Sequence, residues 1–318
     1  IILVFAWDVM VREIIVLLDV PCGGVVTMMI FYCFIMFAPF ASVIGEFMHW
    51  SIERLIFIAW LAQVVFTPLI ALPTDLVDNH FLLLALSTGA VGAVAFFILT
   101  TTVMRTWHLS WPGLKPHWSG DFNWGIFAGL VVVDIIFMAL NTGEMPRLHR
   151  ANWDFTLSAF EAAVMEETLF RFAILGILFY AWRNVKQRLP LALATSSILF
   201  GIVHLTNYGP QEWSMTVLQA VSAAGIGLFF ATVYVYTGQL WLAMVMHFLL
   251  DWTAFIASDS TLMTGKVTVQ NWIGTGIELV VFIGIAVWMM FGQRRQVMER
   301  HVNRLTGEHQ RFDFMIQY

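Results

Sequence analysis

The feature that most constrains this chain is a succession of hydrophobic runs, each close to the length that crosses a membrane. A spanning helix needs about 20 mostly apolar residues, and roughly ten such runs follow one another before residue 293. They cover roughly residues 1–19, 23–45, 55–73, 81–103, 122–141, 155–181, 189–207, 212–237, 239–257 and 270–292. Lipid satisfies no backbone hydrogen bonds, so all of these runs should be helices. Charges interrupt the first run, so the pattern predicts an all-α, polytopic membrane helix bundle with about 9–10 hydrophobic segments.

Composition excludes several other classes of protein. Hydrophobic residues make up 59% of the 318 residues and charged residues 12%, against about 45–50% and about 25% in soluble domains. The chain is therefore not expected to be an ordinary soluble enzyme, a disordered protein or a nucleic-acid-binding protein. Cys22 and Cys33 lie in one apolar run, so a disulfide framework is not expected either.

The placement of lysine and arginine predicts an orientation for this multi-pass integral membrane protein. Cytoplasmic loops carry an excess of basic residues. Alternating sides from the C-terminal tail places Arg54, Arg105, Lys115, Arg183, Lys186, Arg188 and the tail arginines on one side. The opposite side receives Arg147, Arg150 and Lys266. The C-terminal tail is therefore predicted to be cytoplasmic.

Ionisable residues lie inside three of the later runs, where they are costly and are functional hypotheses by default. The run at 155–181 contains Glu166 and Glu167, followed by Arg171. Glu167 and Arg171 are four residues apart on one helix face, so they are expected to pair. Glu166 lies about 100° round the same helix and is left for another role.

Two histidines follow on the next two of these runs. Phe200 lies one turn before His204 and is expected to pack against its ring, while His247 and Asp251 share a helix face. Asp251 could fix the tautomer of His247 or hold it protonated. A polar network that only ties helices together is the structural alternative, but such a network has no need for an unpaired carboxylate beside two histidines.

This residue set suits hydrolysis of a peptide bond without a covalent intermediate. A carboxylate and a histidine that face one water could activate it as general bases, and a second histidine with an acidic or amide group could stabilise an oxyanion. Zinc is the alternative, with Glu166, His204 and His247 as ligands and an open position for water. The sequence contains no H-E-x-x-H motif and no rhomboid-like G-x-S-x motif.

The three motifs resemble those of the CPBP family, the CaaX proteases and bacteriocin-processing enzymes that are also called the Abi family of intramembrane proteases. That family carries E-E-x-x-x-R, F-x-x-x-H and H-x-x-x-N or H-x-x-x-D, in this order. They read here as Glu166-Glu167-…-Arg171, Phe200-…-His204 and His247-…-Asp251. The resemblance covers roughly residues 150–257.

The resemblance implies an all-helical membrane core with the site in a cavity between helices. It implies that Glu166 and His204 activate the water and that His247 and Asp251 form the oxyanion side. Glu167, Arg171 and Phe200 would support this geometry, and no metal or cofactor is expected. The best-studied relatives cleave prenylated CaaX proteins after the modified cysteine, and bacterial relatives are linked to bacteriocin maturation, immunity and peptide-signal processing. In the CaaX enzymes, asparagine takes the place of Asp251.

The resemblance also divides the chain. Residues 1–120 are N-terminal transmembrane helices without a recognised family, residues 121–292 form the CPBP-like core, and residues 293–318 form a polar, basic C-terminal tail. The predicted orientation opens the site towards the non-cytoplasmic side, because His204 lies near the outer end of its span. A CaaX-type enzyme should open to the cytosol. Either the orientation is inverted or the substrate is not of the CaaX kind.

Three functions are compatible with these observations. The first is an intramembrane endopeptidase, whose partners would be a peptide or protein substrate in the membrane and lipids. The second is a catalytically silent accessory or structural subunit of a larger membrane complex, for which the Trp-rich stretch at 107–113 offers contacts to other subunits or to a pigment. The third, a proton-coupled transporter, lacks support from an internal repeat.

Asp134 and Glu278 also lie in apolar runs and are expected to face the cavity or pair with a hydroxyl group.

Overall fold

The computed structural model describes residues 37–70, 79–109, 118, 121–142, 151–263 and 265–307. Regular structure in this part is helical apart from an isolated bridge between Tyr208 and Gln211, which confirms the predicted all-α class. The predicted run at 1–19 and most of that at 23–45 lie outside the described residues. The helices are α3 (Phe37–Glu46), α4 (Ser51–Ile70), α5 (His80–Ser87), α6 (Ala90–Thr106), α7 (Trp124–Thr142), α8 (Trp153–Glu166), η4 (Glu167–Ile174), α9 (Leu175–Ala181), α10 (Arg188–Val203), η5 (His204–Asn207), α11 (Trp213–Thr237), α12 (Leu240–Ser258), α13 (Val269–Met289) and α14 (Gly292–Leu305).

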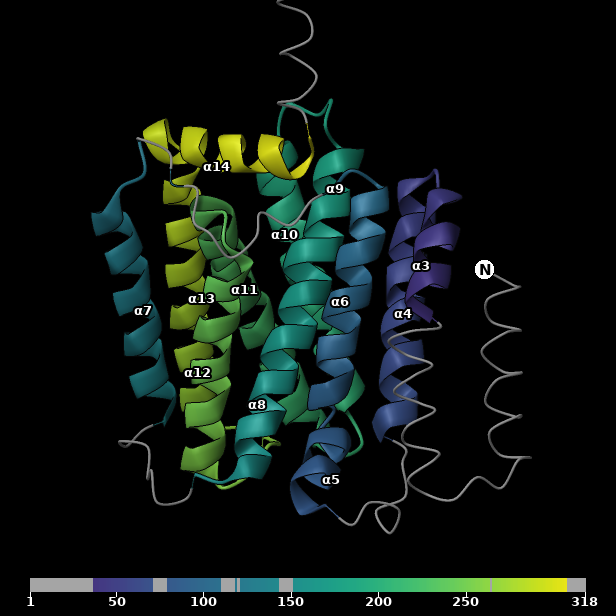
Figure 1. Cartoon of the computed structure of the whole chain (residues 1–318). Helices are drawn as coiled ribbons and strands as arrows, with labels where there is room; N and C mark the ends of the chain where they lie inside the picture. Colours follow the sequence, from purple (N-terminus) through teal and green to yellow (C-terminus); the bar gives the residue numbers. More distant parts are fainter. Residues whose placement is uncertain are drawn as a thin grey trace, which may run out of the picture.

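The long helices stand side by side in one bundle (Figure 1). The α7 helix lies at one edge of the bundle, and α3 and α4 lie at the opposite edge, while α14 crosses one end. Helices α8, α10, α11 and α12, which carry the sequence motifs or pack against them, lie between these edges. The motif residues therefore lie inside the bundle.

Four of the described helical segments are long and apolar enough to cross a membrane. They are Arg188–Asn207, α11, α12 and α13, with mean hydropathies from 1.6 to 1.9. A fifth results if the bent pair α5 and α6 counts as one span. The chain is an integral membrane protein by this criterion, although fewer described helices qualify than the roughly ten runs in the sequence. The α8–η4–α9 helix is long enough, but Glu161, Glu166, Glu167 and Arg171 make it less apolar than these four.

One predicted helix is broken in the structure. The run at 81–103 was expected to form a single helix, but Gly89 divides it into α5 and α6, which meet at 57°. Gly89 has a φ of 82°, a left-handed conformation that glycine adopts without steric cost. The hydroxyl groups of Ser87 and Thr88 both donate to the carbonyl of Leu84, so they bond to the final turn of α5 just before the break.

The helix with the E-E-x-x-x-R motif changes its hydrogen-bonding pattern at the motif. Asn152 caps the start of α8 by accepting from the backbone N–H of Phe155 at 2.8 Å. From Glu167 to Ile174 the chain is a π-helix and then returns to the α-helical pattern in α9. π-helical turns are rare and occur frequently at functional sites. The sequence pattern predicted a continuous helix but not this local change, which begins directly after Glu166.

The tail begins with a helix that packs onto the bundle. The sequence predicted a polar, basic tail, and α14 is indeed polar on one face, but its other face buries Val297, Met298 and Val302. His301 is also buried there, and its Nδ1–H donates to the carbonyl of Val235 at 2.9 Å. Residues 292–305 are therefore part of the folded bundle.

Trp107, the first residue of the Trp-rich stretch, packs inside the bundle. It is 3% exposed, and its indole N–H donates to the carbonyl of Gly45 at 2.6 Å. The guanidinium of Arg54 lies 5.1 Å from the Trp107 ring and 5.0 Å from that of Tyr180. These contacts bring the beginning of α4 and the ends of α6 and α9 to the same end of the bundle.

Candidate functional site

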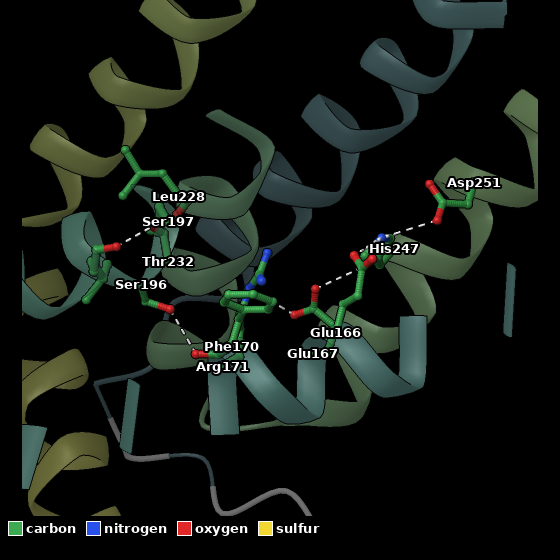
Figure 2. A network of polar contacts seen from close by, with 11 residues as sticks. Glu166, Glu167, Phe170, Arg171, Ser196, Ser197, Leu228, Thr232, His247 and Asp251 are labelled. Atoms are coloured by element: carbon green, nitrogen blue, oxygen red, sulfur yellow. Dashed lines mark hydrogen bonds and ion pairs between the residues drawn. The ribbon is translucent and has the colours of Figure 1, made fainter. Parts of the chain in front are cut away.

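His247 lies beside three carboxylates, those of Glu166, Glu167 and Asp251 (Figure 2). Its Nδ1 lies 2.9 Å from Oε1 of Glu167. Its Nε2 lies 3.3 Å from Oδ2 of Asp251 and 3.6 Å from Oε2 of Glu166. Because a carboxylate accepts hydrogen bonds, the Nδ1–H of His247 donates to Glu167. Its Nε2 faces the space between Glu166 and Asp251.

Glu167 also pairs with Arg171, as the four-residue spacing predicted. Oε2 of Glu167 lies 3.2 Å from Nε of Arg171, and both side chains are almost completely buried. The angle does not make this contact a hydrogen bond, so the two charges form an ion pair. Glu167 thus connects Arg171 through one oxygen with His247 through the other, whereas the sequence had suggested only the first contact.

Phe200 packs against charged and titratable groups from all three motifs. The Arg171 guanidinium lies 4.2 Å from the centre of the Phe200 ring, a distance at which a cation is attracted to an aromatic face. The His204 ring meets the Phe200 ring edge to face at 4.7 Å, as the sequence predicted, and the His247 ring does so at 6.2 Å. Phe200 is 1% exposed and therefore fills the space between these groups.

His204 begins the short η5 helix at the end of α10 and is only partly buried. Its Nδ1 lies 2.8 Å from the carbonyl oxygen of Phe200. A carbonyl oxygen only accepts, so Nδ1 carries the proton and Nε2 of the neutral ring is left with a lone pair. His204 also lies within electrostatic range of Glu166.

The structure therefore brings together Glu166, Glu167, His247 and Asp251 in direct contact, with His204 at the edge of this group. Burial differs within the set: the side chains of Glu166 and Asp251 are 26% and 25% exposed, while those of His247 and Glu167 are 6% and 0% exposed. The accessible side of the site is the one that Glu166 and Asp251 form.

Two further carboxyl groups lie near this set. Asp134 on α7 is buried and lies within electrostatic range of His247, and Glu161 on α8 lies within range of both His247 and Glu166. Glu278 on α13 is different, because both of its carboxylate oxygens accept from the hydroxyl of Ser222 on α11, at 3.2 and 3.0 Å. Glu278 thus makes the hydroxyl pair that the sequence offered as one of two possibilities.

Both histidines of the site are held as metal-bound histidines usually are. Such histidines donate their second N–H to a carboxylate or a backbone carbonyl. The carbonyl of Phe200 accepts from His204, and the carboxylate of Glu167 accepts from His247. Within the described ranges, no three His, Cys, Asp or Glu side chains are arranged to hold a metal ion.

A surface hollow of about 640 Å³ lies on the loop that follows His204. Residues 208–214 alone line it, and Tyr208 and Trp213 meet there edge to face at 5.4 Å. None of the ionisable residues around His247 lines this hollow. The candidate site lies between helices instead.

Comparison with known proteins agrees with the motifs. Residues 149–253, about a third of the 318-residue chain, match the family model described as Type II CAAX prenyl endopeptidase Rce1-like. The match contains all three motifs, so the predicted resemblance to the CPBP family is confirmed over this segment. No curated protein and no solved structure matches the chain.

Proposed function

We propose that the chain is an intramembrane endopeptidase in which Glu166 and His204 activate a water molecule. The family match supports a protease fold of the CaaX type in the membrane. The observation that carries the proposal is the arrangement at His247: Glu167 holds its Nδ1, while the partly exposed Glu166 lies 3.6 Å from its Nε2. A carboxylate that is accessible to water thus lies beside an oriented ring.

In the proposed first step, the carboxylate of Glu166 takes a proton from the bound water. Nε2 of His204 accepts a hydrogen bond from the same water, since Nδ1 is already protonated and held by the Phe200 carbonyl. Together, a carboxylate and a neutral imidazole place and polarise the nucleophile, which general-base catalysis requires.

The water oxygen then attacks the carbonyl carbon of the scissile bond. His247, protonated at both ring nitrogens, donates from Nε2 to the developing oxyanion, while Glu167 accepts from its Nδ1. Oriented donors at this position are often the largest catalytic contribution. Asp251, 3.3 Å from the same nitrogen, takes part as a donor only when it carries a proton, because a carboxylate accepts.

In the last step, Glu166 gives its proton to the leaving nitrogen. The carbon–nitrogen bond breaks, and the products are a new carboxylic acid, which keeps the second proton of the water, and a new amine. Transfer of that proton to the amine then gives a carboxylate and an ammonium group. Glu166 transfers the proton and His204 helps to hold the water, so the proposal includes no metal ion. The proposed substrate is a peptide segment within the membrane, and a prenylated CaaX peptide is the first probe to use.

The test is cleavage by the purified full chain reconstituted in liposomes with a farnesylated CaaX peptide, with products identified by mass spectrometry. The proposal predicts one new amine and one new carboxyl terminus, and the same rate after treatment with a strong chelator. Glu278→Gln, which changes a buried acid paired with Ser222, is the matched control and should cleave like the wild type. Absence of cleavage with this probe and with unprenylated transmembrane peptides would reject the proposal. Activity that returns only with added zinc would reject the metal-free site.

A further inference from the structure

The position of Phe200 depends on a glycine outside the three motifs. Gly227 lies on α11, and a Cβ atom added there would lie 2.8 Å from Cδ1 and 3.4 Å from Cγ of the Phe200 ring. Real Cβ atoms essentially never approach another atom closer than 3.0 Å. The ring therefore packs directly against the α11 backbone and uses the space that any other side chain would fill.

Phe200 has little room to retreat from a methyl group at position 227. The Arg171 guanidinium and the rings of His204 and His247 surround it at 4.2, 4.7 and 6.2 Å, and the Phe170 ring lies at 5.0 Å. The added Cβ would also lie 3.5 Å from Nη2 of Arg171. A displaced ring would move the groups that hold Glu167 and both histidines.

The neighbouring glycines have different surroundings. A Cβ at Gly225, on the same helix, would first meet the tip of Leu279 on α13 at 3.3 Å, a flexible side chain outside the site. A Cβ at Gly201 would lie 2.5 Å from the carbonyl oxygen of Ala220, so that glycine sets the distance between α10 and α11. Of the two glycines of α11, Gly227 is the one that faces the site.

We propose that Gly227 is a positioning residue, whose missing side chain sets the depth of Phe200 and thereby the spacing of Arg171, His204 and His247. This inference rests on the proposed function for its effect on turnover. It extends the site to α11, which carries none of the three motifs.

The experiment is a double-mutant cycle with Gly227→Ala and Phe200→Leu in the reconstituted full chain, with Gly225→Ala as the matched control. Gly227→Ala should lower kcat by about 10- to 100-fold with little change in KM, because a small displacement of catalytic groups has an effect of this size. Gly225→Ala, the same change on the same helix, should retain the wild-type kcat. In the Phe200→Leu background the smaller side chain leaves room for the methyl group, so Gly227→Ala should have little further effect. The inference would be overturned if the fold-loss of kcat in the double variant equalled the product of the losses in the two single variants. An unchanged kcat in Gly227→Ala would overturn it as well.

A second measurement separates this inference from the proposed function. The thermal unfolding midpoints of the same four proteins can be measured whether or not the chain cleaves a peptide. Gly227→Ala should lower the midpoint when residue 200 is Phe, but not in the Phe200→Leu background. If the effects of the two substitutions on the midpoint depend on each other but the chain cleaves no peptide, the proposed protease function is rejected and the link between Gly227 and Phe200 is kept. If the effects simply add in a chain that does cleave the peptide, only that link is rejected. If Gly227→Ala does not fold, recovery of folded protein by Phe200→Leu supports the link, and a double variant that folds as poorly contradicts it.

Discussion

At the scale of single residues, Glu167 carries two contacts that cannot be made independently. One oxygen pairs with Arg171 and the other accepts from His247. Removal of either partner would leave one oxygen of the buried Glu167 carboxylate without a contact. A charge that is buried without its partner is costly. The ion pair and the orientation of the histidine are therefore one structural unit.

Arg171→Ala should reduce both folding and activity. Breaking a buried ion pair by removal of one partner typically costs about 3–5 kcal/mol, and here Glu167 would also lose the charge that fixes its second oxygen. We expect a clearly lower thermal midpoint, lower yield and loss of cleavage, and Arg171→Lys should recover part of the stability. A monodisperse Arg171→Ala chain with full activity would show that the pair is dispensable.

At the scale of elements, the sequence predicted where helices lie better than how they deviate from regularity. The spacing of Glu167 and Arg171 is local and predicted their pairing, but the contact between Glu167 and His247 joins residues 80 positions apart. It depends on how η4 and α12 pack. The break at Gly89 and the π-helix at 167–174 likewise lie inside apolar runs whose spacing predicts continuous helices.

The docking of α14 should depend on the ionisation of His301. Burial, which is the largest cause, lowers the pKa of His301 from 6.5 to about 4. Hydrogen bonds to the backbone of Val235 and Tyr236 oppose this shift, and the nearby charges of Arg304 and Arg300 add to it. The folded state thus disfavours the proton that the unfolded state accepts, so stability is full above about pH 6.5 and falls as the pH drops towards 4. The total loss is about 3 kcal/mol.

Thermal unfolding midpoints between pH 7.5 and pH 4 check this expectation. His301→Gln removes the titrating group, so its midpoint should depend less on pH than that of the wild type in this window. Parallel curves for the two proteins would show that His301 does not contribute to the pH dependence.

At the scale of the whole molecule, hydropathy predicted the class and the motifs predicted the family segment. The division into residues 1–120, 121–292 and 293–318 remains a prediction. The tail's cytoplasmic side is a proposal from the basic residues, and it agrees with the way Arg54 contacts Trp107 and Tyr180 at one end of the bundle. His204 lies at the opposite end of α10 from the 182–188 turn, so the proposed orientation opens the site away from the cytoplasm.

Cysteine labelling in intact cells tests this orientation. With Cys22 and Cys33 replaced by serine, Lys266→Cys should react with a membrane-impermeant maleimide, and Lys186→Cys should react only after the cells are opened. The positive-inside rule is the physical reason. The reverse pattern would place the site towards the cytosol, where prenylated CaaX proteins occur.

If Glu166 is the base that activates the water, the turnover of the Glu166→Gln variant should reveal it. The amide keeps the shape of the side chain but cannot take a proton, while Glu167, His247 and Asp251 remain in place. Removal of a general base typically costs about 100- to 10,000-fold, so kcat should fall by at least about 100-fold while the unfolding midpoint and the size-exclusion profile stay close to those of the wild type. A Glu166→Gln chain that cleaves the peptide at the wild-type rate would contradict the account.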